Sequence, residues 1–214
     1  RCLFMKKRVA ILNFAGCNNY GANLTAFALL RQCGREGWDA RLVDRRFSFD
    51  FPEADDIFAT FGGRHLKWTA PCYGVEHAKL LNARYDAFIV GSDQVWAYRP
   101  DWMRMQLVDQ RAMYDLEFAA PGKLRIAMAA SFGGGDYSDV PVAFREARAK
   151  ALQLFDAVSV REKGGVEICR RLLETDAQHV LDPVFFLSSK EWGKLADKDR
   201  SKLPPRYAAL CVLE

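Results

Sequence analysis

The sequence predicts an α/β fold built on an open parallel sheet, and two stretches carry this prediction. The stretch Asp86–Trp96 reads Asp-Ala-Phe-Ile-Val-Gly-Ser-Asp-Gln-Val-Trp, in which an apolar run stops at Gly91 and becomes a polar loop. This pattern is typical of a buried strand in a parallel sheet. Nearer the N-terminus, Arg8–Phe14 is another apolar run. The strand, Gly/Asn loop, helix and strand that begin there have the order of a right-handed βαβ unit.

The first half of the chain is expected to continue with a helix over Ala22–Arg35, where apolar residues recur at helical spacing. A strand at Ala40–Asp44 follows. Residues 45–80 show no sustained period, so we expect an irregular connection there, with a helix near Val75–Ala83. Trp96 lies two residues past a polar pair, and we interpret this large aromatic side chain as part of a cleft wall.

The second half of the chain alternates the same two kinds of pattern. In chain order we expect a loop with a helix that covers the cleft at 97–121, a strand at Lys123–Ser131, a helix at Pro141–Phe155, a short strand at Ala157–Lys163, a helix at Gly165–Leu173, a strand at Gln178–Leu181 and a helix with a Ser cap at Ser188–Trp192. The apolar run after Pro204-Pro205 resembles the opening strand of another domain. We therefore expect one domain over residues 6–203, and a linker with the first strand of a second domain over residues 204–214.

Size and composition predict a globular protein and exclude several function classes. The chain has 214 residues, of which 50% are hydrophobic and 27% charged, and this balance supports a domain with a good core. No stretch approaches the roughly 20 apolar residues of a membrane span. The net charge of +4 is spread along the chain, so nucleic acid is not expected as a partner, whereas anionic small molecules stay open as ligands. Because no secretion signal is found, we expect a cytoplasmic protein.

The cysteines and histidines predict no metal site. The cysteines form no Cys-x-x-Cys pair and have no His at metal-ligand spacing, so we expect reduced thiols. They are Cys2, Cys17, Cys33, Cys72, Cys169 and Cys211. His65 and His77 are expected to have surface or helix-packing roles, and His179 to lie structurally beside the last strand. The loop after the first strand lacks both Gly-x-Gly-x-x-Gly and Gly-Lys-Ser/Thr, so we predict neither NAD nor ATP as a cofactor.

Polar residues at the expected carboxyl ends of strands are candidate ligand contacts, because ligands of open parallel sheets bind beyond those ends. Ser92, Asp93 and Gln94 follow one such strand. The glycines after Ser131 indicate either a close approach of the backbone or simple flexibility. Arg161 offers a planar fork for a carboxylate or phosphate, and an internal salt bridge is the alternative. The first Gly/Asn loop, at the start of a helix, suits an anion or a sugar.

Five ordered segments resemble the polysaccharide pyruvyl transferase family. They are Asn19–Ala22, Phe88–Trp96, Ala129–Gly133, Ser159–Lys163 and Val180–Pro183. Each segment alone is a weak signal, but the ordered set is a strong one. The resemblance implies a Rossmann-like open parallel sheet with helices on both faces, similar to the N-terminal half of a two-domain GT-B type transferase.

The resemblance also implies a reaction, in which the pyruvyl group of phosphoenolpyruvate is joined to two hydroxyls of a sugar as a ketal with loss of phosphate. The expected partners are phosphoenolpyruvate as donor substrate and a sugar or lipid-linked oligosaccharide as acceptor, with no further cofactor. By this resemblance, Arg161 holds phosphoenolpyruvate. The other expected substrate-binding residues are Asn19 and Gly21 in the first loop and Ser92, Asp93, Gln94 and Ser131 in the cleft.

The sequence departs from the family pattern in two ways. Thr25, Ala97, Gly164 and Val184 stand where Gln, Asn, Ser and Thr are common, which affects hydrogen bonds to ligands rather than the fold. The Ser-x-Arg-x-His segment that would supply a catalytic His is absent, so we assign no catalytic residue and expect this chain alone to be inactive. Two other functions stay open: a nucleotide-sugar glycosyltransferase of the same fold, and a non-catalytic sugar-binding module.

Overall fold

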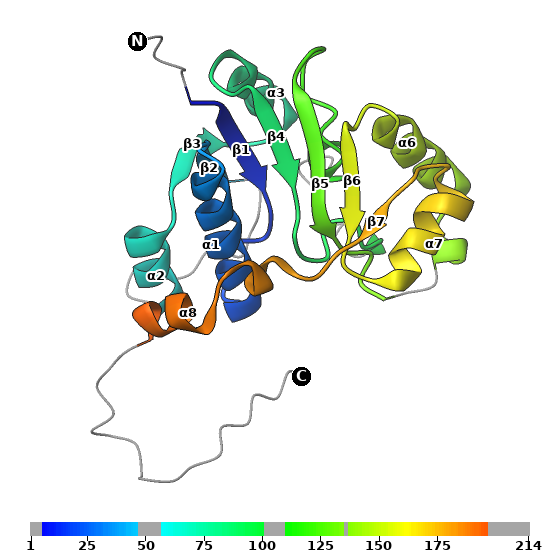
Figure 1. The fold of residues 1–214 in the computed structure, drawn as a ribbon. Helices are drawn as coiled ribbons and strands as arrows, with labels where there is room; N and C mark the ends of the chain where they lie inside the picture. The colour runs from blue at the N-terminus through cyan, green and yellow to red at the C-terminus, as the bar shows by residue number, and fades with distance from the viewer. Residues whose placement is uncertain (1–5, 47–56, 101–109, 135–136, 197–214) are drawn as a thin grey trace, which may run out of the picture.

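The computed structural model describes residues 6–46, 57–100, 110–134 and 137–196, which form a single seven-stranded parallel sheet (Figure 1). The strand order is β3-β2-β1-β4-β5-β6-β7. The strands are β1 (Arg8–Leu12), β2 (Asp39–Arg45), β3 (Trp68–Cys72), β4 (Ala87–Val90), β5 (Leu124–Ala130), β6 (Ala157–Val160) and β7 (Gln178–His179). The chain winds outward from β1 to β3 and then returns to build β4 to β7 on the other side. The reversal lies between β1 and β4, where ligand crevices form in such sheets.

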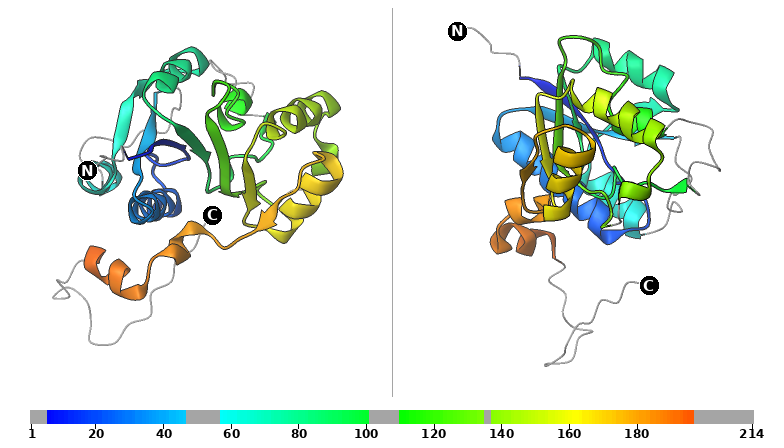
Figure 2. Two further views of the ribbon diagram at one scale, coloured as in Figure 1. Left: turned by 45° about the horizontal axis from the view of Figure 1, so that its top comes forward. Right: turned by 90° about the vertical axis from the view of Figure 1, so that its right-hand side faces the viewer.

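Helices cover both faces of the sheet (Figure 2), which confirms the predicted Rossmann-like class. One face packs against α1 (Tyr20–Arg35), α2 (Ile57–His65) and α8 (Ser189–Leu195). The other packs against α3 (Val75–Leu80), α5 (Gln110–Tyr114), α6 (Val142–Leu152) and α7 (Lys163–Leu172). Three short 3-10 turns connect these elements: η1 (Leu81–Ala83), η2 (Tyr137–Asp139) and η3 (Pro183–Phe186). The expected Ser cap of α8 is confirmed, because Ser188 and Glu191 form a capping box.

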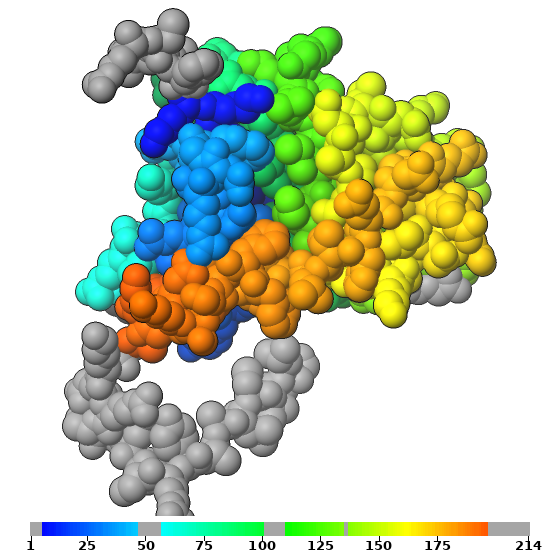
Figure 3. Space-filling model, in the orientation of Figure 1, coloured from blue at the N-terminus to red at the C-terminus, as the bar shows by residue number. Residues whose placement is uncertain are grey.

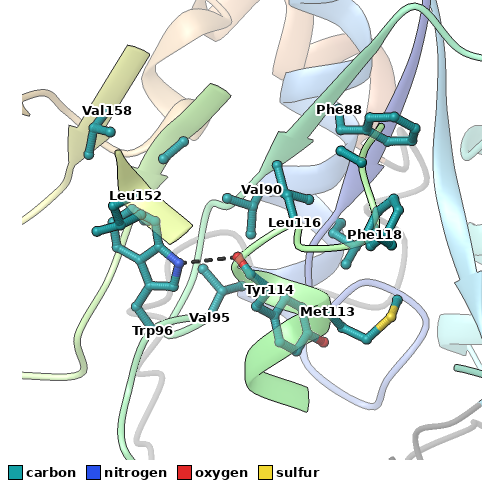
Figure 4. Packing of buried hydrophobic residues seen from close by; sticks show 14 of the residues in the cluster. Phe88, Val90, Val95, Trp96, Met113, Tyr114, Leu116, Phe118, Leu152 and Val158 are labelled. Carbon is teal, nitrogen blue, oxygen red and sulfur yellow. Dashed lines mark hydrogen bonds between the residues drawn. The ribbon is translucent and has the colours of Figure 1, made fainter. Parts of the chain in front are cut away.

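Strand β4 shows why the central strands read as continuous apolar runs. Its alternate residues point to opposite faces, so that Phe88 and Val90 enter one core while Ala87 and Ile89 enter the other. All four are buried because helices cover both sides. The core that contains Phe88 has more aromatic residues than the core on the other face of the sheet. Figure 4 shows Phe88, Trp96 and Phe118 within it.

The structure corrects the expectation of an irregular connection at residues 45–80, because this segment contains β3 and α2 as well as the expected α3. Strand β3 reads Trp-Thr-Ala-Pro-Cys, and Pro71 is the reason that its pattern does not predict a strand. The strand lies at the edge of the sheet, where it pairs only with β2 and the missing N–H of proline is tolerated. Residues 47–56 of this segment lie outside the described residues.

One expectation about the segment after β4 is wrong, and it concerns Trp96. In helix α5, Ala112, Met113 and Tyr114 are buried on the side of the sheet on which α3 lies. Trp96 is fully buried, and its Nε1 donates a hydrogen bond of 3.2 Å to the carbonyl of Tyr114 (Figure 4). A side chain with no exposed surface forms part of the core and not of a cleft wall. Residues 101–109 lie outside the part of the chain that the structure describes.

Several sequence expectations concern features outside the sheet. Cys33, Cys72 and Cys169 are free thiols as expected. His65 packs edge-on against Phe27, which confirms a helix-packing role. None of the described helices has the length and apolar composition needed to cross a membrane. The proposed linker and second-domain strand at 204–214 lie outside the described residues.

Candidate functional site at the carboxyl ends of β4 to β7

The candidate site is centred on Arg161, which follows the carboxyl end of β6. Its Nη1 donates a hydrogen bond of 2.8 Å to Oδ2 of Asp182, at the end of the β7 segment. Its Nη2 lies 3.4 Å from Oδ1 of Asp93, in the loop after β4, and its Nε lies 3.5 Å from Oε1 of Glu162. Parallel strands end at the same edge of a sheet, so residues distant in sequence meet there.

Arg161 forms the internal salt bridge, which is one of the two alternatives that the sequence leaves open. Three carboxylates surround one guanidinium, which gives the group a net charge of −2 when all four side chains are ionised. Burial alone would lower the pKa of Arg161. The hydrogen bond to Asp182 and the charges of Asp93, Asp182 and Glu162 outweigh burial and raise that pKa above its ordinary value. The guanidinium therefore stays charged, and the site offers carboxylate oxygens as hydrogen-bond acceptors.

Asp182 holds this group together, and the sequence assigns it no role in the site. Its Oδ2 accepts hydrogen bonds from Arg161 and, at 3.2 Å, from Oγ of Ser92. Its Oδ1 accepts a bond of 3.1 Å from the backbone N–H of Val184, so Asp182 also caps η3. The signal that could have identified it is the Asp-Pro pair that directly follows a strand, because Asp before Pro is a common cap of a helical turn.

Ser92 and Ser131 are both fully buried, so in this structure they position other groups of the site. Ser92 Oγ also accepts a 2.6 Å hydrogen bond from the backbone N–H of Asp93. Ser131 Oγ donates to a carboxylate oxygen of Glu162 and accepts a 3.1 Å bond from the N–H of Gly133. The other oxygen of Glu162 is buried, and no described residue donates a hydrogen bond to it.

The loop after β4 has a backbone conformation that only particular residues allow. Gly91 has φ +110°, and a Cβ there would lie 2.3 Å from the carbonyl oxygen of Met128, so no larger residue fits. The Gly91–Ser92 peptide bond is cis, and Asp93 has φ +83°. The loop is tied to β5, since Ser131 N–H donates to Asp93 O at 2.9 Å and Trp96 N–H donates to Ser131 O at 3.0 Å. Asp93 and Ser131 are therefore held in fixed register.

Gln94, the last of the predicted cleft residues in this loop, is only partly exposed. Its Oε1 accepts a hydrogen bond from Arg99. A Cβ at Gly133 would lie 3.2 Å from the same oxygen, so the glycine-rich turn after β5 approaches this side chain closely. The alternative that the glycines provide only flexibility does not describe Gly133.

Asn19 and Gly21 lie in a separate set of hydrogen bonds, after the carboxyl end of β1. Asn19 caps α1 by accepting a 3.0 Å bond from the N–H of Ala22. Asn23, which is buried, donates to the carbonyls of Cys17 and Asn19 and thereby holds the loop against the helix. Gly21 lies close to the Asn19 side chain, because a Cβ at this glycine would be 3.2 Å from Asn19 Oδ1. Both predicted residues thus shape the first loop.

A buried ionic network supports the β4 loop from the side of α6. Arg148 is 1% exposed, and its Nη1 donates 2.6 Å hydrogen bonds to the carbonyl of Trp96 and to the hydroxyl of Tyr137. Its Nε donates to Oδ1 of Asp115 at 2.9 Å. Burial raises the pKa of Asp115, although the charges of Arg148 and Arg111 oppose this shift. Sequence reasoning missed Arg148 and Asp115, because neither belongs to a motif.

Comparison with protein-family models identifies the family of this chain. Residues 19–213 match the family described as Polysaccharide pyruvyl transferase. The chain belongs to the polysaccharide pyruvyl transferase family. The match covers most of the chain and includes the β4 loop, Arg161 and Asp182. Among curated proteins, no relative matches the chain.

Solved structures with a similar fold include two of an alpha-glucosyltransferase. One, in complex with UDP-glucose and DNA containing an abasic site, has a TM-score of 0.45 and 13% identity over 83% of this chain and 43% of that chain. Another, in complex with UDP and a 13-mer DNA containing a HMU base, has a TM-score of 0.46 and 13% identity over 83% of this chain and 42% of that chain. The chain spans less than half of the length of these structures, and at this similarity they carry no argument about function.

Proposed function

We propose that this pyruvyl transferase family member contributes the acceptor-side domain of an enzyme that transfers the pyruvyl group of phosphoenolpyruvate onto two hydroxyls of a cell-surface sugar. The observation that supports this proposal best is the group of carboxylates around Arg161, at the strand ends where ligands of such sheets bind. Carboxylate oxygens accept hydrogen bonds from sugar hydroxyls, and a partly exposed carboxylate can also serve as a general base.

The proposed reaction needs two protons to move. Each sugar hydroxyl oxygen forms a bond to the central carbon of the enolpyruvyl group. The methylene carbon of the enolpyruvyl group gains one proton and becomes a methyl group. The bond from the central carbon to the phosphate oxygen breaks, and the second proton leaves with phosphate. Asp93, whose side chain is 20% exposed, is the candidate acceptor of the hydroxyl protons. The acid that protonates the methylene carbon is expected from the family's Ser-x-Arg-x-His segment.

Arg161 is proposed to contact the donor through Nη2. Its Nη1 is fixed by Asp182 at 2.8 Å, whereas the 3.4 Å contact between Nη2 and Asp93 is longer and correspondingly weaker. The carboxylate or phosphate of phosphoenolpyruvate can replace Asp93 at Nη2 and release that carboxylate toward the acceptor. This exchange would couple donor binding to the freeing of a base.

The test uses the full-length enzyme with phosphoenolpyruvate and a panel of oligosaccharides and lipid-linked oligosaccharides. We expect phosphate release and a ketal methyl signal in the proton NMR spectrum with at least one acceptor, and no turnover by the 214-residue chain alone. Absence of both signals across the panel would refute pyruvyl transfer. Tight binding of a nucleoside diphosphate without binding of phosphoenolpyruvate, measured by calorimetry, would favour a nucleotide-sugar glycosyltransferase instead. We further propose a cytoplasmic location and no cofactor besides the donor substrate.

A further inference from the structure

A cavity of about 690 Å³ lies between α1, α2 and α8, away from the strand ends that carry Arg161. Figure 3 views the molecule from the side on which α1 and α8 lie. The floor of the cavity includes the apolar and aromatic side chains of Phe27, Trp38, Leu66 and Leu187. Its volume falls within the range of about 300–1,000 Å³ that is common for small-molecule sites.

The cavity lining concentrates positive charge. Its basic residues are Arg31, Arg35, Arg64, Lys67 and Lys194, and its one acidic residue is Glu191. Five positive charges and one negative charge give a net charge of +4 with His65 neutral, which equals the formal net charge of the entire chain. The lining of this cavity is therefore strongly positive.

The positive charges are poorly neutralised by the protein itself. Glu191 is already engaged by Arg35 and by both the backbone and the hydroxyl of Ser188. Arg31 lies over the ring of Phe27, with 5.0 Å from its Cζ to the ring centroid. Among residues 6–46, 57–100, 110–134 and 137–196, none forms an ion pair or side-chain hydrogen bond with Arg64, Lys67 or Lys194.

Helix capping accounts for only part of this arrangement. Arg35, Arg64 and Lys194 lie in the last turns of α1, α2 and α8, where a positive charge stabilises the helix dipole. That effect does not explain Arg31 or Lys67, because Lys67 lies between α2 and β3 and Arg31 lies before the last turn of α1. It also does not explain why the three helix ends meet around an aromatic floor.

We propose that this cavity binds a phosphate-bearing ligand, with the phosphates between Arg64, Lys67 and Lys194 and an apolar or planar portion of the ligand against Phe27 and Trp38. A lining with a net charge of +4 suits a ligand with two or more negative charges, and arginine forks match phosphate geometry. The inference does not rest on pyruvyl transfer, because the cavity shares no residue with the Arg161 group.

Binding of two probes tests the proposal: inorganic pyrophosphate in calorimetry, and vesicles of phosphatidylcholine and phosphatidylglycerol in co-sedimentation. The test variant is R64E/K67E, whose two side chains are exposed and have no partner among the described residues. The control is R84E/K150E, which changes the net charge by the same amount at exposed residues outside the cavity. Circular dichroism and thermal melting establish that both variants fold like the wild type.

We expect R64E/K67E to lower the affinity for at least one probe by about tenfold or more, and R84E/K150E to leave it within about twofold. Binding of pyrophosphate with this dependence identifies a soluble phosphate-bearing ligand. Binding of the vesicles alone with the same dependence identifies a lipid headgroup as the source of the phosphate. Binding of neither probe by the wild type would overturn the proposal. An equal loss in both variants would also overturn it, because it would show general attraction to a basic surface.

Discussion

Arg148 and Trp96 are joined by a 2.6 Å hydrogen bond from the guanidinium Nη1 to the backbone carbonyl, and this bond connects the centre of α6 to the end of the loop that carries Asp93. Both side chains are almost completely buried. A buried charge is tolerated only when its donors are satisfied and a counter-charge is near, and Asp115 supplies that counter-charge.

Replacement of Arg148 by methionine should strongly destabilise the chain, because Asp115 and the Trp96 carbonyl would lose their principal donor. We expect a loss of about 3–5 kcal/mol in the free energy of unfolding, measured by urea denaturation. K150M, an exposed substitution on the same helix, is the control and should have little effect. The double variant R148M/D115L should recover part of the loss, since it removes both charges together. Equal midpoints for R148M and K150M would contradict the assignment of this network as a support of the loop.

Replacement of Asp182 by asparagine should reduce the activity of the full-length enzyme without unfolding it. The substitution keeps an oxygen that can cap η3 but removes the negative charge that holds Nη1 of Arg161. We expect kcat/KM for phosphoenolpyruvate to fall by about tenfold, which corresponds to ~1.4 kcal/mol in transition-state stabilisation. D176N, which changes an exposed acid near the same edge strand, should retain activity. Unchanged kcat/KM in D182N would show that Asp182 does not position Arg161.

Gly91 should not tolerate alanine. Its φ of +110° and the 2.3 Å approach of a Cβ to the Met128 carbonyl together predict a loss of about 3 kcal/mol or more. Gly37 provides a matched comparison, because it also has a positive φ, +79°, but nothing lies within 4 Å of its Cβ position. G37A should therefore lose only about 1 kcal/mol. Chemical denaturation of both variants separates steric overlap from backbone strain, and equal losses would argue against the overlap.

The salt bridge and cap at Glu191 should make α8 sensitive to acid. Hydrogen bonds from Ser188 and Arg35 lower the pKa of Glu191 to about 2. A lowered carboxyl pKa stabilises the folded state above the ordinary pKa of about 4.5, and that stabilisation is lost as the pH falls toward 2. The difference in unfolding free energy between wild type and E191Q should thus be larger at about pH 7 than at about pH 3. A difference that stays constant with pH would mean that Glu191 titrates as it does in the unfolded chain.

The buried thiols should resist alkylation in the folded protein. Burial raises the pKa of Cys33 to about 11 and that of Cys169 to about 12, so neither forms much thiolate at about pH 8. Cys17 is partly exposed. We expect iodoacetamide to label Cys17 well before Cys33 and Cys169, as measured by peptide mass spectrometry, and all of them to react equally in urea. Early labelling of Cys169 in the native protein would contradict its burial.

The sequence is most informative where a strand has helices on both faces. Ala87–Val90 is buried throughout and has the continuous apolar run expected of a central parallel strand. It is least informative at the sheet edge, where β3 contains a proline and has no sustained apolar pattern. The expectation that Trp96 lines a cleft rests on its position after polar residues. Position alone does not show that the loop returns to the end of β5, where the backbone N–H of Trp96 donates to the carbonyl of Ser131 and the Trp96 side chain is buried.

The candidate site also combines residues that the sequence predicts with residues that it does not. Ser92, Asp93 and Arg161 can be found because they follow strands, and strand ends in a parallel sheet meet. The sequence does not show that the fork of Arg161 is occupied by Asp182, since the segment between them includes a helix and a strand. Arg148 escapes prediction for a related reason. A charged residue in an amphipathic helix pattern is ordinarily assigned to solvent, and only the packed structure shows that Asp115 faces it.

Strand β7 makes one side of the candidate site easier to open than the others. It is two residues long and pairs only with β6, yet Asp182 reaches Arg161 through the segment that follows it. Short edge strands open more readily than central ones, since few hydrogen bonds must break. A fluctuation that lifts β7 would release Arg161 from its tightest partner while β4, β5 and β6 stay paired. The backbone of Arg161 is therefore fixed to the sheet, whereas its side chain is oriented by a residue that follows a short edge strand.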